Sequence, residues 1–244
     1  MTCYLNRGLI LEQAVAELLR EYLADLKLES KYENFRVKVT NRHPFADLLV
    51  DGGIRAADTF PAVVVGTETD RKPPELDALA PHVEAIGLEE ADIEQITADM
   101  KKPGLCTVVD DDTLGAIRET IGRQGVAYGW SMRVRRQDTL GVDIWCENEQ
   151  LKNELYEQVR LFVLGAMRFR LDDEYSFFDI ALFDGNVRGE RSGNYNMDFD
   201  VVLTGAHLSF EVNYCEEQIA INTELSAPSD GEIILEVKND VKKN

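Results

Sequence analysis

Three consecutive aspartates at residues 110–112 could hold a hard cation, because clustered carboxylates suit Mg²⁺ and Ca²⁺. The cluster lacks the glycine and the bidentate glutamate of an EF-hand calcium loop. The residues that follow it place Leu114, Ile117 and Ile121 at helical spacing. Acidic side chains interact favourably with the dipole at a helix N-terminus. The sequence therefore favours a helix cap over a metal site here.

A second pattern with chemical potential is Asp230 followed by Glu236-Val-Lys238. In metal-dependent nucleases an aspartate and a Glu-x-Lys triplet surround Mg²⁺. The short interval between Asp230 and Glu236 leaves little room for the strand that usually precedes the triplet. Alternating glutamate and lysine is also common in exposed strands. A Mg²⁺-dependent nuclease that uses Asp230, Glu236 and Lys238 is kept as an alternative, and the main expectation is that the protein is not an enzyme.

The histidines and cysteines form no recognisable ligand set. They are scattered along the chain as His43, His82, His207, Cys3, Cys106, Cys146 and Cys215. The chain has no CxxC pair, no glycine-flanked serine or cysteine of a hydrolase, and no glycine loop that would cradle a phosphate. We therefore predict no catalytic residue, no metal site and no cofactor, and expect the cysteines to be free thiols in a reducing cytosol.

Arg133, Arg135 and Arg136 form a basic patch in an otherwise acidic chain. Two interpretations remain open. These arginines could be the solvated face of a strand, or they could pair with acidic residues of a neighbouring subunit.

The segment around these arginines predicts a β-hairpin that leads into a helix. Trp130, Met132 and Val134 alternate with polar residues, residues 137–139 can form a turn, and alternation resumes from Leu140 to Cys146. Asn148 is a favourable N-cap. An amphipathic helix is then expected as far as Met167, and it should pack back onto the hairpin.

The other expected elements complete an α+β fold. Helices are predicted at 8–28, at 89–101 and directly after the three aspartates, and strands at 35–39, 60–65, 105–109, 175–183, 197–203 and 207–214. Residues 204–206 form either a tight turn or a bulge within one long bent strand, and Ile219, Ile221 and Leu225 continue the strand character. We expect a mostly antiparallel sheet packed by the N-terminal helix and by the central amphipathic helix. One domain should span residues 1–225, with an α/β insertion at 67–125. Residues 226–244 should form a linker and a strand-like tail.

Composition limits the possible functions. The 244 residues carry a formal net charge of −19. That charge disfavours tight wrapping of nucleic acid or docking on anionic membranes, which both depend on Lys and Arg. The N-terminus does not resemble a signal peptide, and no apolar run is long enough to cross a membrane. The sequence predicts a soluble, intracellular protein.

The order of these elements resembles that of the tail-terminator proteins of tailed bacteriophages. The resemblance covers residues 8–66 and 126–222. Its most characteristic parts are the strand at 60–65, the Val142-Asp-Ile-Trp145 strand with a helix start at Glu147-Asn148, and the Leu208-Ser-Phe-Glu-Val-Asn-Tyr214 strand.

The resemblance implies a structural virion subunit, made in the host cytoplasm, that assembles as a hexameric ring. Such a ring caps the tail tube, joins it to the head–tail connector and lets DNA pass through its lumen without specific binding. A neck, collar or other connector subunit is the alternative within this class. The expected subunit interface includes Arg133, Arg135, Arg136 and Trp145. A soluble adaptor or chaperone that binds a partner through the 67–125 insertion is a further hypothesis.

Overall fold

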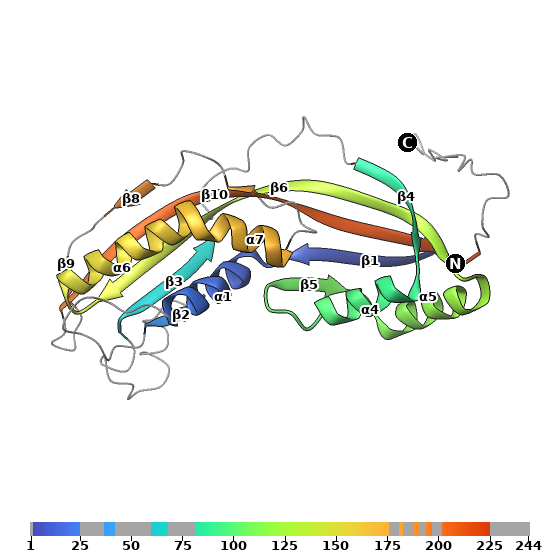
Figure 1. Ribbon diagram of the computed structural model, residues 1–244, viewed down its shortest axis with the longest axis horizontal. Helices are drawn as coiled ribbons and strands as arrows, with labels where there is room; N and C mark the ends of the chain where they lie inside the picture. Colours follow the sequence, from blue (N-terminus) through green and yellow to red (C-terminus); the bar gives the residue numbers. More distant parts are fainter. Residues whose placement is uncertain are drawn as a thin grey trace, which may run out of the picture.

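Two very long strands form the centre of the computed structural model (Figure 1). The structure describes residues 2–24, 37–41, 60–67, 82–175, 181–182, 188–190, 194–196 and 202–224. β6 spans Ala127–Cys146 and β10 spans Val202–Asn222. They pair antiparallel in one unbroken register, from Thr204 opposite Cys146 to Ile221 opposite Gly129. Strands are usually five or six residues long, whereas these two have 20 and 21 residues. The two-stranded ribbon that they form therefore determines the shape of the whole fold.

The half of the ribbon that contains Cys146 and Thr204, here called the near half, is widened on both sides. β3 (Ala62–Thr67) pairs antiparallel with β6, and β2 (Lys38–Thr40) pairs parallel with β3. On the opposite side, three short strands pair with β10: β7 (Ala181–Leu182), β8 (Arg188–Glu190) and β9 (Asn194–Asn196).

The other half of the ribbon, here called the far half, has different flanking strands. β4 (His82–Leu88) pairs with β6, β1 (Thr2–Leu9) pairs with β10, and β5 (Leu105–Val108) pairs with β1. All of these pairings are antiparallel. The far half therefore joins the beginning of the chain, the insertion and the two central strands in one sheet.

Separate groups of helices cover the two halves. α1 (Leu11–Ala24) and a long helix lie over the near half. The long helix consists of α6 (Glu149–Leu161), a π-helical turn η2 (Phe162–Ala166) and α7 (Met167–Tyr175). α4 (Glu90–Asp99) and α5 (Asp111–Gln124) lie beside the far half (Figure 1).

The two hydrophobic cores lie on opposite faces of the ribbon. In the near half the core residues of β6 and β10 are even-numbered: Leu140, Val142, Ile144, Cys146, Ala206, Leu208, Phe210, Val212 and Tyr214. In the far half they are the odd-numbered Ala127, Ile219 and Ile221. Because the register does not shift between the halves and side chains alternate between the faces, α1 and α6 cover one face and α4 and α5 cover the other.

The structure confirms the predicted fold class, an α+β fold with a mixed, mostly antiparallel, curled sheet. Asn148 caps α6 as predicted, because its side chain accepts hydrogen bonds from the backbone N–H groups of Gln150 and Leu151. The insertion contains helices and strands as expected. Its strands join the central sheet, however, and its helices close the second core.

The predicted hairpin at residues 130–146 is wrong. Residues 137–139, predicted to turn, lie within β6 and pair with residues 211–213 of β10. β10 is continuous from Val202 to Asn222, so residues 204–206 do not form a tight turn, and the strand character predicted at Ile219 and Ile221 belongs to the same strand. The N-terminal helix begins at Leu11 rather than at residue 8, because residues 2–9 form β1. Tyr175 ends α7 and does not begin a strand.

Some predictions fall outside the described residues. These are the linker and tail at 226–244, with the nuclease candidates Asp230, Glu236 and Lys238, and His43 in its predicted turn.

Candidate functional site

A row of charged residues crosses the helix-covered face of the far half. The strand register places Arg7 of β1 opposite Glu217 of β10, and Glu217 opposite Arg133 of β6. Glu217 Oε2 lies 3.6 Å from Arg7 Nη1, and Glu217 Oε1 lies 3.6 Å from Arg133 Nε. The hydroxyl of Ser131 donates a 2.5 Å hydrogen bond to Glu217 Oε1. One buried carboxylate is thus held between two guanidinium groups.

The insertion supplies the outer partners of this row. Arg7 Nη2 donates a 2.8 Å hydrogen bond to Asp99 Oδ2 at the end of α4. Arg133 Nη2 lies 3.8 Å from Glu84 Oε1 of β4. The Glu217 side chain is only 5% exposed, and a charge at such a depth is tolerated when it is paired. The row therefore ties β1, β10, β6, β4 and α4 together.

A cavity of about 460 Å³ lies beside the charged row. Its lining includes the carboxylates of Glu84, Asp92, Asp99 and Glu217 and the guanidinium groups of Arg7 and Arg133. The size is within the range of small-ligand pockets, and the excess of carboxylates would favour a cationic group. In the part of the chain that the structure describes, no three histidine, cysteine, aspartate or glutamate side chains are arranged to hold a metal ion.

The residues predicted to form a subunit interface do not share one surface. Arg133 belongs to the charged row. Arg136 lies on the other face of β6, where its Nε donates a 2.8 Å hydrogen bond to Glu216 Oε2, and this bond raises the pKa of Arg136 above its ordinary value. Arg135 is exposed near the middle of the ribbon. Trp145 lies near the end of β6, opposite Gly205.

The far half has an apolar face that no described helix covers. One cross-strand row contains Tyr4, Ala220, Trp130 and Ala85, and the next contains Val108, Asn6, Gln218, Met132 and Val83. Tyr4 and Val108 are each 59% exposed, Val83 is 51% exposed, and Val134 on the same face is 37% exposed. Trp130 and Met132 are half-buried. We call Tyr4, Val83, Val108, Trp130, Met132 and Val134 the sheet face.

The three aspartates act as the predicted helix cap. The side chain of Asp110 accepts a 2.6 Å hydrogen bond from the backbone N–H of Thr113 in the first turn of α5. This bond lowers the pKa of Asp110 below its ordinary value.

Two of the histidines lie beside carboxylates, and two of the cysteines differ in their burial. His207 Nδ1 lies 2.7 Å from Asp143 Oδ1 across the ribbon, and His82 Nε2 lies 3.5 Å from Glu84 Oε2. Cys106 is exposed, whereas burial raises the pKa of the Cys146 thiol to about 12.

Sequence reasoning missed both the charged row and the sheet face. The row depends on pairs that are far apart in the chain, from Glu84 with Arg133 to Arg7 with Glu217, and no local pattern reports them. A signal for the sheet face did exist, because Trp130, Met132 and Val134 alternate as apolar residues. By itself, such an alternation indicates the buried face of a half-buried strand and not an exposed one.

The chain matches no protein-family model and no curated protein. None of the helices in the described ranges is long and apolar enough to cross a membrane.

Proposed function

We propose that this protein is a structural subunit of a bacteriophage head–tail junction, and specifically of the tail-terminator ring. In this role it caps the tail tube and joins it to the connector, while DNA passes through the lumen of the ring. A neck, collar or other connector subunit is the alternative within the same class. The proposal combines the resemblance of the element order to tail terminators with one structural observation, the sheet face.

The sheet face supports an assembly role. A group of exposed apolar side chains on one face of a protein can mark a contact with another macromolecule. This one lies on a chain with a net charge of −19, so it stands out from an acidic surface. A sheet generally buries an apolar face against another layer. Among the described residues, the far half has such a layer on one side, formed by α4 and α5.

The acidic charge suits a ring around DNA. Lys and Arg contacts to phosphate provide most non-specific affinity for nucleic acid. A lumen lined by carboxylates would repel the phosphate backbone and let it slide. The ring would also protect the outer edges of β4 and β5, since exposed strand edges can otherwise cause aggregation.

The proposal is tested by measuring the size of the particles that the purified chain forms. We expect rings in negative-stain micrographs and a hexamer-sized species by mass photometry, either alone or after addition of tail-tube protein. Replacing Tyr4→Asp and Val83→Asp together should prevent ring formation without unfolding the protein, because both side chains are more than half exposed. We call this double substitution the sheet-face variant.

Met100→Asp is the matched control, since Met100 is also exposed, at 40%, but lies outside the sheet face. The control should form rings like the wild type. A wild-type protein that stays monomeric with both tail-tube and connector proteins present would contradict the proposed function.

A further inference from the structure

The cavity beside the charged row contains a carboxylate oxygen that accepts no hydrogen bond from the described residues. This atom is Oε2 of Glu217, whose side chain lines the cavity and is 5% exposed. The other oxygen of this carboxylate accepts a hydrogen bond from Ser131. Arg7 Nη1 lies 3.6 Å from Oε2, a distance that allows an ion pair but is too long for a hydrogen bond. A buried acceptor without a donor is costly, so Oε2 favours a hydrogen-bond donor inside the cavity.

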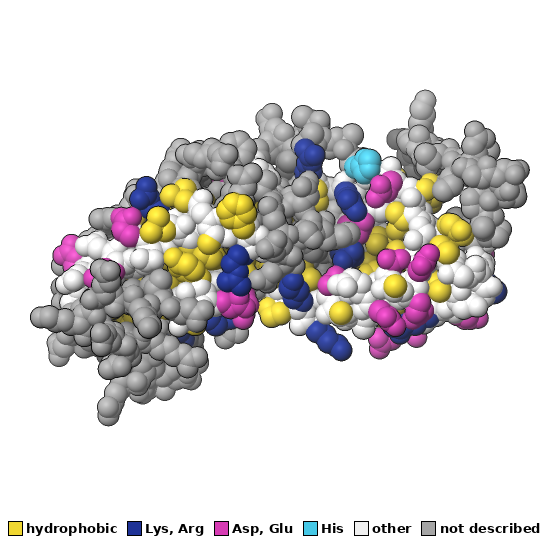
Figure 2. All heavy atoms as spheres, viewed as in Figure 1, with side chains coloured by type: hydrophobic (Ala, Val, Ile, Leu, Met, Phe, Trp, Pro, Cys, Tyr) yellow, Lys and Arg dark blue, Asp and Glu magenta, His cyan; other side chains and the backbone are white. Residues whose placement is uncertain are grey.

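The charges that line the cavity leave an excess of two carboxylates. Each arginine of the charged row contacts two carboxylates, and the row has three carboxylates for its two guanidinium groups. The row therefore keeps one net negative charge. Asp92 also lines the cavity and adds a second negative charge. An anion would have to displace a carboxylate from an arginine, whereas a cation meets an excess of negative charge. Figure 2 shows acidic side chains gathered over α4 and α5, which adds to the attraction of a cation.

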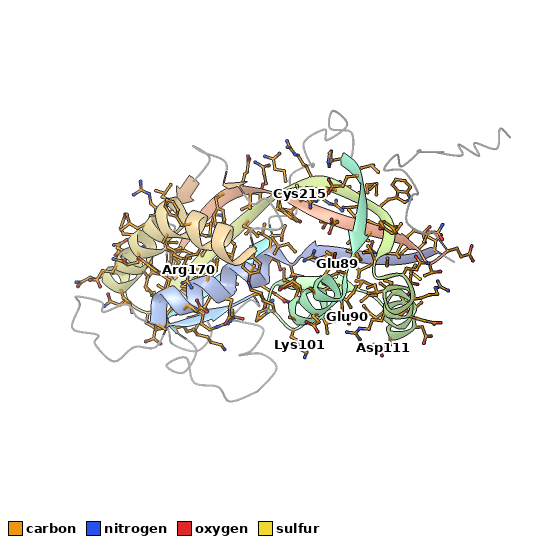
Figure 3. All side chains as sticks on the ribbon, turned by 45° about the vertical axis from the view of Figure 1, so that its right-hand side comes forward. Glu89, Glu90, Lys101, Asp111, Arg170 and Cys215 are labelled. Carbon is orange, nitrogen blue, oxygen red and sulfur yellow. The ribbon has the colours of Figure 1, made fainter. Side chains whose placement is uncertain are left out.

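The two excess charges lie at different places along α4. Asp99, which belongs to the row, is the last residue of this helix, and Asp92 is its third. Seven residues of α-helix span roughly 10 Å. Figure 3 marks the two ends of the helix with Glu89 and Lys101. An extended ligand can therefore reach a carboxylate near each end of α4.

Aliphatic side chains form another part of the lining. They include Ile86 and Leu88 of β4, Ile96 of α4 and Ile219 of β10. A metal ion does not fit these surroundings, because hard cations need several oxygen ligands and no three such side chains are arranged to hold one among the described residues. The cavity instead suits a chain of methylene groups with an N–H donor at each end.

We propose that this cavity binds a small linear aliphatic diamine. One ammonium group donates a hydrogen bond to Glu217 Oε2, the methylene chain packs against Ile96, and the second ammonium group pairs with Asp92. Each ammonium group then neutralises one of the two excess negative charges. Water fills the volume that the chain does not occupy, as is usual in polar cavities. This inference goes beyond the proposed function and does not depend on ring formation.

Isothermal titration calorimetry of the full chain with 1,6-diaminohexane tests the proposal. We expect one binding site per chain. Hexylamine has one ammonium group and should bind about threefold more weakly, because it leaves one exposed carboxylate without a partner. The diamine with both nitrogens trimethylated keeps the charge and the chain but has no N–H group, so it should bind about tenfold more weakly. If the diamine does not bind, or if either analogue binds as tightly, the inference is overturned.

Three substitutions that preserve side-chain shape locate the site. Glu217→Gln should lower the affinity for the diamine about tenfold. Asp92→Asn should lower it about threefold, and the asparagine oxygen can still accept the hydrogen bond that Asp92 accepts from the backbone N–H of Glu89. Glu94→Gln is the matched control, because it removes the same charge from an exposed position of the same helix outside the cavity. Its affinity should equal that of the wild type.

The contrast between the two substitutions in α4 decides the outcome even if Glu217→Gln does not fold, as judged by circular dichroism. Equal losses of affinity in Asp92→Asn and Glu94→Gln would show that the diamine responds only to overall charge, and this result overturns the inference. The sheet-face variant should bind the diamine like the wild type, because Tyr4 and Val83 lie on the other face of the sheet. A protein that forms no rings but binds the diamine in this pattern contradicts the proposed function and supports the inference.

Discussion

Glu217 illustrates how single residues hold the far half together. Its carboxylate lies between Arg7 and Arg133 and accepts a hydrogen bond from Ser131. Breaking a buried ion pair by removing one partner is costly, because it leaves an uncompensated charge away from water. The neighbouring Glu216 has a different environment, since it pairs with Arg136 at an exposed site.

We expect Glu217→Ala to lower the free energy of unfolding by about 3 kcal/mol. Glu216→Ala is the matched control and should cost less than about 1 kcal/mol, as exposed ion pairs do. Urea denaturation followed by circular dichroism measures both values. Equal effects of the two substitutions would show that the buried charged row does not stabilise the fold.

The difference between a buried and an exposed position also applies to charge reversal at Arg133 and at Arg135. Arg133→Glu would place a second carboxylate beside Glu217, so it should destabilise the monomer itself. Arg135→Glu changes an exposed residue and should leave the monomer folded. Loss of assembly after charge reversal at Arg133 would therefore not identify an interface.

Asp110 gives a prediction for the dependence of stability on pH. Because its pKa is lowered in the folded protein, its contribution to stability is present above the pKa of an unfolded aspartate. That contribution is lost as the pH falls through the folded pKa. Asp110→Ala should therefore lower the melting temperature at neutral pH, and this difference should vanish in strong acid. Asp110→Asn should retain most of the cap.

Added Mg²⁺ tests the alternative role of the same residues. If Asp110 acts only as a helix cap, Mg²⁺ should not change the melting temperature of the wild type or of Asp110→Ala. A melting temperature that rises with Mg²⁺ in the wild type but not in Asp110→Ala would favour the cation site instead.

At the scale of elements, sequence patterns predicted those caps, strands and helices that depend on interactions between residues close together in the chain. The caps at Asp110 and Asn148, the buried strand near Val63 and the helix that starts after Asn148 all depend on residues a few positions apart. The turn predicted at 137–139 did not form, because the pairing of these residues with β10 outweighs their turn preference. Gln137 donates a hydrogen bond to Glu211, and Asp138 accepts one from Tyr214.

One sequence signal pointed to the continuous strand. Apolar residues fall on even positions both before residue 137, at Trp130 and Met132, and after it, at Val142 and Ile144. Arg136 and Asp138 interrupt the apolar series, but the series keeps the same phase on both sides of them, as a single strand requires. The change of buried face from the near half to the far half could not be predicted, because it depends on which helices reach each half.

The insertion is another element whose role the structure revises. α4, α5 and Leu88 of β4 share one hydrophobic core with Leu5, Ile219 and Ile221. We therefore expect a chain that lacks residues 82–125 to lose cooperative unfolding of its far half and to bind a hydrophobic dye. A deletion protein with wild-type stability and no dye binding would show that the insertion is a separate module.

At the scale of the whole molecule, the ribbon makes the protein long. A strand of about 20 residues spans roughly 65 Å, whereas a compact chain of this length has a radius of gyration of about 18 Å. Small-angle X-ray scattering of the monomeric sheet-face variant should give a radius of gyration clearly above that value. A dilution series controls for association, and a compact value would contradict the extended ribbon.

The pairing of β1 with β10 has a consequence for synthesis on the ribosome. Thr2 pairs with Asn222, and Arg7 pairs with Glu217, so β1 must wait until β10 has been made, about 200 residues later. At translation rates of about 5–20 residues per second, the wait is roughly 10–40 s. During that time the nascent chain exposes the apolar side of β1, and chaperones would have an early segment to hold. Folding of the far half is therefore expected to complete only after β10 has been translated.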